Sequence, residues 1–149
     1  MNLVIKKFDD LNTKELYEII RERINVFVVE QNCPYEECDK KDLKSFHLFL
    51  EEKDTIVAYL RIIPKGVSYN EVSIGRVLVS KGHRNKGLAK YLLSEAIKFI
   101  KKELKESEIR ISAQEYIMKF YEDLGFVKVS QIYLEDNIPH VEMVYGKQS

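Results

Sequence analysis

The chain carries no excess charge of either sign and has no long hydrophobic run. Its 149 residues include 24 Lys and Arg and 24 Asp and Glu, so the formal net charge is zero. A protein without a net field does not attract nucleic acid or an acidic membrane surface at long range, and we expect neither as a partner. No stretch reaches the ~18 apolar residues of a membrane span, and the N-terminus lacks the apolar core of a signal peptide. We therefore expect a cytoplasmic protein.

Cysteine is also scarce. Cys33 and Cys38 are the only two in the sequence, and their spacing fits neither a CxxC redox motif nor a paired zinc knuckle. We expect two reduced thiols and no metal. An alternative is a metal site of mixed ligand types and irregular spacing, made of Cys33, Cys38, Asp39, Asp42 and His47.

Two common nucleotide-binding motifs are missing. Gly82 and Gly87 have the separation of the P-loop glycines, but Leu88 and Ala89 stand where that motif needs Lys and Ser or Thr. A GxGxxG sequence does not occur at all. A P-loop NTPase and a Rossmann dinucleotide site are therefore both unsupported.

Length and pattern indicate one α/β domain. The chain is 45% hydrophobic, enough for one core, so we expect a single domain over residues 1–149. The patterns predict strands and helices that combine into a mixed sheet flanked by helices. Strands are predicted over residues 3–8, 45–50, 55–63, 71–79, 109–113, 126–129 and 141–145, and helices from Asn12 or Thr13, over 86–105 and over 115–124. Residues 26–35 are expected to be a helix end or loop, and residues 36–44 an exposed loop or short helix.

The most informative stretch is residues 77–89, where an apolar strand leads through a short basic loop into a long amphipathic helix. A helix N-terminus leaves several backbone N–H groups without intrahelical partners and carries partial positive charge. Such a strand, loop and helix start form an anion site. The stretch therefore predicts a bound phosphate or pyrophosphate.

Within this stretch, Arg84-Asn85-Lys86-Gly87-Leu88-Ala89 resembles the Arg/Gln-x-x-Gly-x-Gly/Ala pattern of the GNAT superfamily of acyl-CoA-dependent N-acyltransferases. The strand before it, the helix after it and the later strand–helix unit ending at Gly125-Phe126 follow the order of that family. The resemblance covers essentially the whole chain. It implies the GNAT fold, with a mixed, mostly antiparallel central sheet flanked by helices, and acetyl-CoA as cosubstrate.

The resemblance also implies roles for individual residues. The strand residues that would align the pantetheine arm are Val77, Leu78 and Val79. The backbone N–H groups that would hold the pyrophosphate belong to Arg84, Asn85, Lys86, Gly87, Leu88 and Ala89. Gln114 occupies a position that commonly contacts the cofactor, and Tyr121 matches a tyrosine often placed beside the CoA sulfur. A phenol there can protonate the departing thiolate, and the Val79 N–H is a candidate oxyanion donor.

A narrower resemblance is to the ElaA-like subgroup. It rests on residues 23–35, followed by Asp39, Asp42 and His47, and on residues 74–77 and 138–140. In this fold the acceptor site lies between the first helices and the closing strands. The resulting acceptor-side candidates are Glu30, Gln31, Arg76 and His140. The general base stays open among Glu30, His47 and His140, with histidine best suited by its ordinary pKa.

These features together predict an N-acetyltransferase that transfers an acetyl group from acetyl-CoA directly to a primary amine in a ternary complex. The alternative is a non-catalytic acyl-CoA-binding sensor or partner module. The sequence does not identify the acceptor amine, and it leaves a homodimer open.

Overall fold

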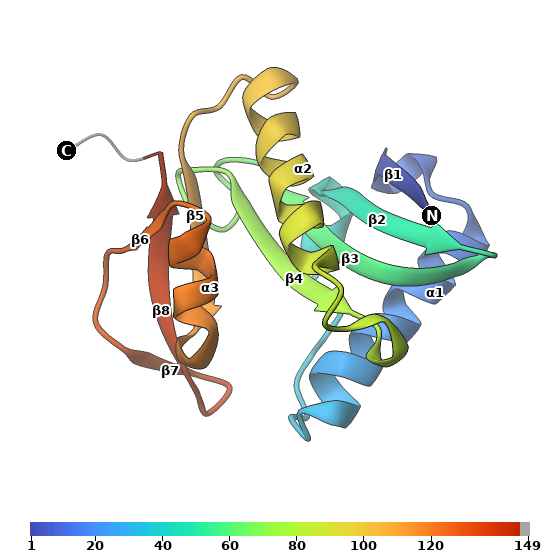
Figure 1. Cartoon of the computed structure of the whole chain (residues 1–149), viewed down its shortest axis with the longest axis horizontal. Coiled ribbons are helices and arrows are strands. Elements are labelled where there is room, and N and C mark those ends of the chain that lie inside the picture. Colours follow the sequence, from blue (N-terminus) through green and yellow to red (C-terminus); the bar gives the residue numbers. More distant parts are fainter. Residues whose placement is uncertain (147–149) are drawn as a thin grey trace.

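The computed structural model describes residues 1–146, which form two antiparallel four-stranded sheets (Figure 1). The first sheet has the order β1-β2-β3-β4, and in the second sheet β8 pairs with β5, β6 and β7. The strands of the first sheet are β1 Asn2–Lys7, β2 Phe46–Glu52, β3 Thr55–Ile63 and β4 Ser73–Val79. Those of the second are β5 Ile109–Gln114, β6 Phe126–Lys128, β7 Tyr133–Glu135 and β8 Ile138–Tyr145. The predicted mostly antiparallel α/β architecture is confirmed.

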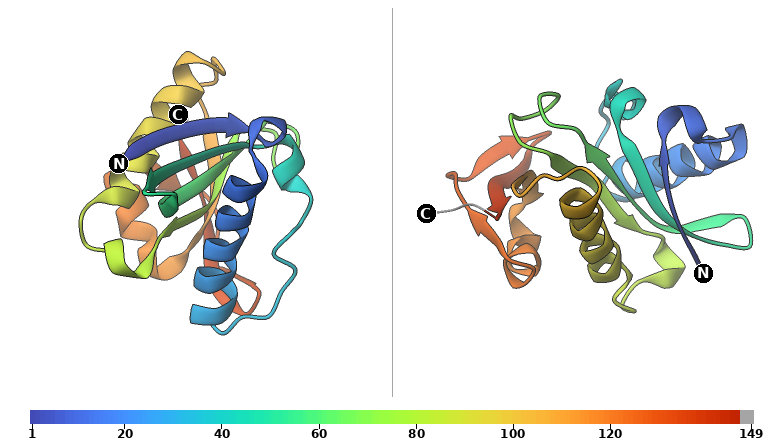
Figure 2. Two further views of the ribbon diagram at one scale, coloured as in Figure 1. Left: turned by 90° about the vertical axis from the view of Figure 1, so that its right-hand side faces the viewer. Right: turned by 90° about the horizontal axis from the view of Figure 1, so that it is seen from above.

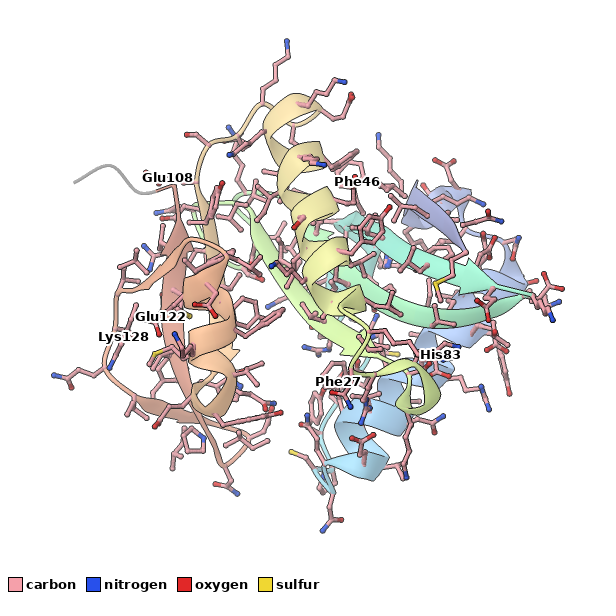
Figure 3. All side chains as sticks on the ribbon, in the orientation of Figure 1. Phe27, Phe46, His83, Glu108, Glu122 and Lys128 are labelled. Carbon is pink, nitrogen blue, oxygen red and sulfur yellow. The ribbon has the colours of Figure 1, made fainter. Side chains whose placement is uncertain are left out.

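Within residues 1–146, three α-helices cover the sheets: α1 Thr13–Arg23, α2 Leu88–Lys102 and α3 Met118–Asp123. The helices α1 and α2 lie on opposite faces of the first sheet, and α3 packs on the second (Figures 1 and 2). The predicted apolar stripe of α2 is buried, with Leu92, Ala96 and Ile100 fully inaccessible. The stripe joins one core that runs across both sheets. Phe46 of β2, labelled in Figure 3, packs edge-on against Phe99 of α2. A smaller core under α1 includes Ile19.

A capping box fixes the start of α1. The side chain of Asn12 accepts from the Glu15 N–H at 2.7 Å, and the Glu15 carboxylate accepts from the Asn12 N–H at 2.9 Å. Of the two cap candidates in the sequence, Asn12 and Thr13, the N-cap is thus Asn12. Each bond satisfies a backbone donor that the helix itself leaves unpaired.

We expect Asn12→Ala to lower the free energy of unfolding by about 1 kcal/mol, because it removes the N-cap acceptor. Asn12→Asp keeps an acceptor oxygen and adds favourable charge at the helix start, so its stability should match or exceed that of the wild type. Urea denaturation of the three proteins measures this. Equal losses in both variants would contradict the capping role.

Three features of the chain go beyond the sequence-based expectation. The helix end expected within residues 26–35 takes the form of a π-helical segment, Ile24–Glu30. The expected exposed loop over residues 36–44 buries two of its carboxylates, Glu37 and Asp42. The strand β7, which pairs with β8 in a hairpin, is one that the pattern did not reveal.

The two sheets touch at one end and separate at the other. A parallel bridge joins Val72 to Ile109, and the Arg110 N–H donates to the Val72 carbonyl at 2.9 Å. Further along β4, a bulge places Arg76 and Val77 opposite a single residue of β3, and Arg76 has a φ of 53°. Bulges bend a strand and increase its twist. The strands β4 and β5 therefore diverge, as Figure 1 shows.

Candidate functional site

A cavity of about 880 Å³ occupies the space where β4 and β5 diverge. It is lined by β4, the start of α2, the end of β5, α3, β8 and the π-helical segment. The predicted site residues that line it are Glu30, Gln31, Arg76, Val77, Leu78, Val79, Arg84, Asn85, Gly87, Leu88, Ala89, Gln114, Tyr121 and His140. Lys86 is exposed and is the one predicted residue outside this lining. The fold thus gathers residues from the whole chain around one cavity.

The N-terminus of α2 opens onto this cavity. Gly87 is the N-cap, with a left-handed φ of 75°, and its carbonyl accepts the first helical hydrogen bond, from the Tyr91 N–H at 3.1 Å. The amides of residues 88–90 therefore have no acceptor within the helix. Leu88 and Ala89 line the cavity beside Asn85, which also has a left-handed φ. This arrangement of donors and helix dipole suits an anion.

Arg84 ties this loop to its surroundings with its side chain. Its Nε donates to the Val79 carbonyl at 2.9 Å, and its two Nη atoms donate to the Glu30 carboxylate at 2.7 and 2.8 Å. Glu30 is the last residue of the π-helical segment, which also carries Phe27. Figure 3 shows Phe27 and His83 near the point where β4 ends and the loop begins. The guanidinium is thus committed to protein partners, so an anion bound at this loop would meet the backbone amides rather than the Arg84 side chain.

The last residue of β4 directs its backbone into the cavity. The Ser80 N–H donates to the Val57 carbonyl at 2.9 Å, so this pair faces β3. In an antiparallel ladder, hydrogen-bonded and non-bonded pairs alternate. The N–H and carbonyl of the preceding Val79 therefore point to the opposite edge, which is the cavity side. The Arg84 bond to the Val79 carbonyl agrees with this orientation.

Tyr121 of α3 lies at the wall of the cavity and is 6% exposed. Its ring packs edge-on against Phe120 and Phe126, with centroids 5.3 and 5.7 Å away. Burial, and to a lesser degree the neighbouring Tyr116, raises the pKa of the phenol above its ordinary value. Among residues 1–146 the hydroxyl has no hydrogen-bond partner. Tyr121 therefore holds a neutral O–H that is available to a ligand.

Two contacts cross the cavity from the segment after the π-helix to the second sheet. The Gln114 side chain at the end of β5 lies 3.4 Å from the Gln31 side chain. The Cys33 thiol lies 3.6 Å from the carbonyl of Asp136, in the β7–β8 hairpin. The segment after the π-helix therefore spans the opening on the face of the sheet covered by α1.

The histidines His140 and His47 lie in different environments. His140 of β8 lines the cavity, with Nδ1 2.6 Å from the Ile138 carbonyl and Nε2 3.5 Å from the Glu135 carboxylate. His47 of β2 is fully buried, with Nδ1 2.7 Å from the Tyr59 hydroxyl and Nε2 3.0 Å from the Asp42 carbonyl. Burial lowers the pKa of His47 and keeps that ring neutral.

A buried ionic cluster lies at one side of the cavity. Arg23 is fully inaccessible and donates to Glu37 and Asp42, each at 2.7 Å. The Arg61 guanidinium bonds Asp39 through both of its Nη atoms, at 2.8 and 2.6 Å. Arg76 of the bulge donates to Glu37 at 2.9 Å. Three arginines face three carboxylates, so the cluster is balanced as a buried ion network must be. Arg61 and Arg76 also line the cavity.

The cluster predicts a loss of stability in acid. Burial raises the pKa of Asp39, but the Arg61 hydrogen bonds and charge outweigh it and hold that pKa well below its ordinary value. A carboxylate with a depressed folded-state pKa stabilises the fold above its unfolded-state pKa, ~3.9, and loses this contribution as pH falls.

We therefore expect Asp39→Asn to be less stable than wild type at neutral pH. Its free energy of unfolding should also fall less steeply below about pH 5, the region in which unfolded aspartate begins to bind protons. Asp123→Asn removes an exposed carboxylate paired with Lys119 at 3.4 Å and should behave like wild type. Urea denaturation over a pH series measures the slopes. Parallel slopes in wild type and Asp39→Asn would contradict the ionic role.

The sequence matches a known protein family over most of its length. Residues 11–146 match the family of the acetyltransferase (GNAT) domain. The chain belongs to the GNAT acetyltransferase family. It is thus an acyltransferase, and its family uses acyl-CoA cosubstrates.

Several similar proteins match nearly the whole chain. The UPF0039 protein C11D3.02c of Schizosaccharomyces pombe is 45% identical over 96% of this chain and 95% of its own length. An acyl-CoA N-acyltransferase structure from Pseudomonas aeruginosa is 36% identical, with a TM-score of 0.91 over 97% of this chain and 99% of that one. The structure of Escherichia coli ElaA is 33% identical, with a TM-score of 0.90 over the same shares. The predicted ElaA-like relationship is confirmed.

The metal alternative receives no support from this GNAT structure. Asp39 and Asp42 bind arginines, His47 uses both ring nitrogens, Cys33 is buried and Cys38 is exposed. Both thiols are free. Across residues 1–146, no group of three or more His, Cys, Asp or Glu side chains is arranged to hold a metal ion. In the same range, no helix is long and apolar enough to cross a bilayer.

Sequence reasoning missed part of the cavity lining. The cavity is also lined by Phe27, Tyr35, Arg61, Tyr116 and Phe120. Arg61 carries a signal that could have been used, because it is the one charge inside the otherwise uncharged strand β3. A charge in a central strand needs a buried partner, and this points to acidic residues elsewhere in the chain.

Proposed function

We propose that this protein is an N-acetyltransferase, acting as a single domain over residues 1–149, in which acetyl-CoA and a primary amine meet in the cavity between β4 and β5. The observation that carries the proposal is the shared cavity, which joins an anion-binding helix N-terminus, an open strand edge and a buried phenol. These three features match the pyrophosphate, the pantetheine amides and the thioester of one extended ligand.

In this proposal the amides from Arg84 to Ala89 hold the pyrophosphate, and the free edge of Val77, Leu78 and Val79 aligns the pantetheine arm. Gln114 contacts the cofactor from the facing strand. The acceptor enters from the side of Glu30, Gln31, Arg76 and His140. The ionic cluster on that side carries no net charge, so it favours neither a positive nor a negative acceptor. It therefore does not by itself select a protein or a small molecule.

The chemistry then uses groups that the cavity already presents. A neutral amine attacks the thioester carbonyl, and the Val79 N–H donates to the oxyanion of the tetrahedral intermediate. The C–S bond breaks as Tyr121 gives its proton to the sulfur. The phenol is protonated at all physiological pH values because its pKa is raised. Transfer is direct, within a ternary complex, and needs no covalent enzyme intermediate.

Thiol release from acetyl-CoA with a panel of amines and peptides tests this function. Acetylation of at least one amine, with stoichiometric free CoA, is the expected result. Tight binding of acetyl-CoA without transfer to any member of the panel would instead support the alternative, a non-catalytic acyl-CoA-binding module.

A further inference from the structure

We propose that His140 is the general base of the transfer and that Glu135 positions it and opens its proton path to solvent. The inference rests on the proposed function. Its structural basis is a histidine whose ring is fixed by one backbone carbonyl and faced by one carboxylate at the wall of the acceptor half of the cavity.

The proton balance requires such a group. An alkylammonium acceptor has three protons on nitrogen, and the amide product keeps one. One of the other two ends on the CoA sulfur, through Tyr121 in the proposed mechanism. The remaining proton must leave before the nitrogen can attack, because an amine with a pKa near ~10 is mostly charged at neutral pH. The C–N bond forms only after a base has taken that proton.

The geometry removes the other two candidates. His47 is fully buried, lies outside the cavity lining and uses both ring nitrogens in hydrogen bonds. Glu30 lines the cavity but binds Arg84 through both carboxylate oxygens. The Arg84 hydrogen bonds lower the pKa of Glu30, which makes it a weaker base. His140 is the candidate that both reaches the cavity and keeps a nitrogen available.

The Ile138 carbonyl fixes which nitrogen is available. A carbonyl oxygen only accepts, so Nδ1 of His140, 2.6 Å away, must carry the hydrogen of this bond. In the neutral ring the lone pair is therefore on Nε2. Tyr133 stacks on the imidazole, with centroids 6.2 Å apart, and holds its plane. The ring is thus preset as a proton acceptor before any substrate binds.

Glu135 lies beside the ring nitrogen that takes the proton, and it connects this nitrogen to solvent. Its Oε2 lies 3.5 Å from Nε2, so a proton taken by Nε2 comes to rest beside a negative charge. Its Oε1 lies 3.4 Å from the Ser112 hydroxyl, which limits where the carboxylate can turn. The side chain of Glu135 is 52% exposed, whereas that of His140 is 9% exposed. The proton therefore has a short route from the cavity through the carboxylate to water.

The other groups around His140 do not compete for this role. On β5, its register partner Gln114 does not titrate. On β7, Tyr133 contributes its ring face, and burial raises the pKa of its phenol. Across the cavity, three ion pairs hold charged side chains: Glu30 with Arg84, Arg61 with Asp39 and Asp42, and Arg76 with Glu37 and Asp39. The charged residues Lys41, Lys90 and Asp136 also line the cavity. Glu135 is thus the carboxylate in contact with the imidazole.

Two small probe amines separate a base from a structural histidine. Ethanolamine is protonated at neutral pH, and hydroxylamine is already neutral. With acetyl-CoA saturating, we expect His140→Gln to lower kcat/KM for ethanolamine by roughly 100-fold and to affect hydroxylamine much less. Glu135→Gln should lower kcat/KM for ethanolamine less than His140→Gln does and should leave hydroxylamine near wild type, because the carboxylate lies on the proton path and takes no part in the attack. The matched control Asp136→Asn removes the next carboxylate and should leave both amines near wild type.

Each outcome has a separate meaning. Equal losses for both amines in His140→Gln would overturn the base assignment and indicate a structural role. Failure of the wild-type protein to acetylate either amine would count against the proposed function itself. Nitrogen-15 NMR of the histidines then tests His140 without any acceptor: the neutral ring should carry its hydrogen on Nδ1, and a hydrogen on Nε2 would overturn the inference.

Discussion

Replacing Tyr121 with phenylalanine should lower kcat by roughly 10²- to 10⁴-fold, the usual contribution of a positioned general acid. Acetyl-CoA affinity should remain near that of the wild type, because the ring keeps its packing against Phe120 and Phe126. The variant should also fold normally, since the lost hydroxyl has no protein partner within residues 1–146. Without the phenol, the thiolate has to leave unprotonated or take its proton from water.

Steady-state kinetics and calorimetry of acetyl-CoA binding measure these two quantities separately. Tyr91→Phe is the matched control, because Tyr91 is an exposed α2 tyrosine outside the cavity lining and its loss should change neither value. An unchanged kcat in Tyr121→Phe would refute the acid role. A loss of affinity with kcat intact would show instead that the hydroxyl binds the cofactor.

Gly87→Asp should abolish measurable acetyl-CoA binding, since it places a carboxylate at the helix terminus that is proposed to hold the pyrophosphate. Crowding within the protein is not the cause, because a Cβ built at Gly87 meets no atom within 4 Å. Two effects remain: the left-handed φ of 75°, which disfavours most side chains, and the repulsion between aspartate and phosphate.

Gly87→Asn separates these two effects. Asparagine tolerates the left-handed region about as well as aspartate does and has nearly the same size, but it is neutral. We expect Gly87→Asn to bind acetyl-CoA weakly and Gly87→Asp at least about tenfold more weakly, a difference of about 1.4 kcal/mol. The difference should shrink at high ionic strength, as screening predicts. Equal affinities in the two variants would show that no anion binds at this helix terminus.

The sequence predicted the elements whose pattern is local. The stripe from Leu88 to Leu104 recurs at helical spacing, and Gly87 marks the turn into the helix, so α2 and its loop could be placed correctly. The strand β3 was recognisable because apolar residues fill both of its faces. The family resemblance then indicated that distant residues share one site. Arg84 and Tyr121 lie 37 positions apart in the sequence, and both line the cavity.

The parts that could not be predicted depend on distant contacts. Arg23 meets Glu37 and Asp42, and Arg76 meets Glu37, across 14 to 39 positions of sequence. These partners bury two carboxylates, Glu37 and Asp42, within a charged stretch that the sequence indicates to be exposed. The π-helical segment has a hydrogen-bond spacing that no simple periodicity encodes. The divergence of β4 from β5 depends on one bulged residue, Arg76, whose left-handed φ the sequence does not announce.

A crystal structure of the protein with CoA tests the central claim most directly, because it places every part of the ligand at once. The account predicts the pyrophosphate on the backbone amides of residues 84–89, the pantetheine along the free edge of β4 and the sulfur within hydrogen-bond reach of the Tyr121 hydroxyl. CoA bound outside the cavity between β4 and β5, or with its sulfur far from Tyr121, would contradict the account.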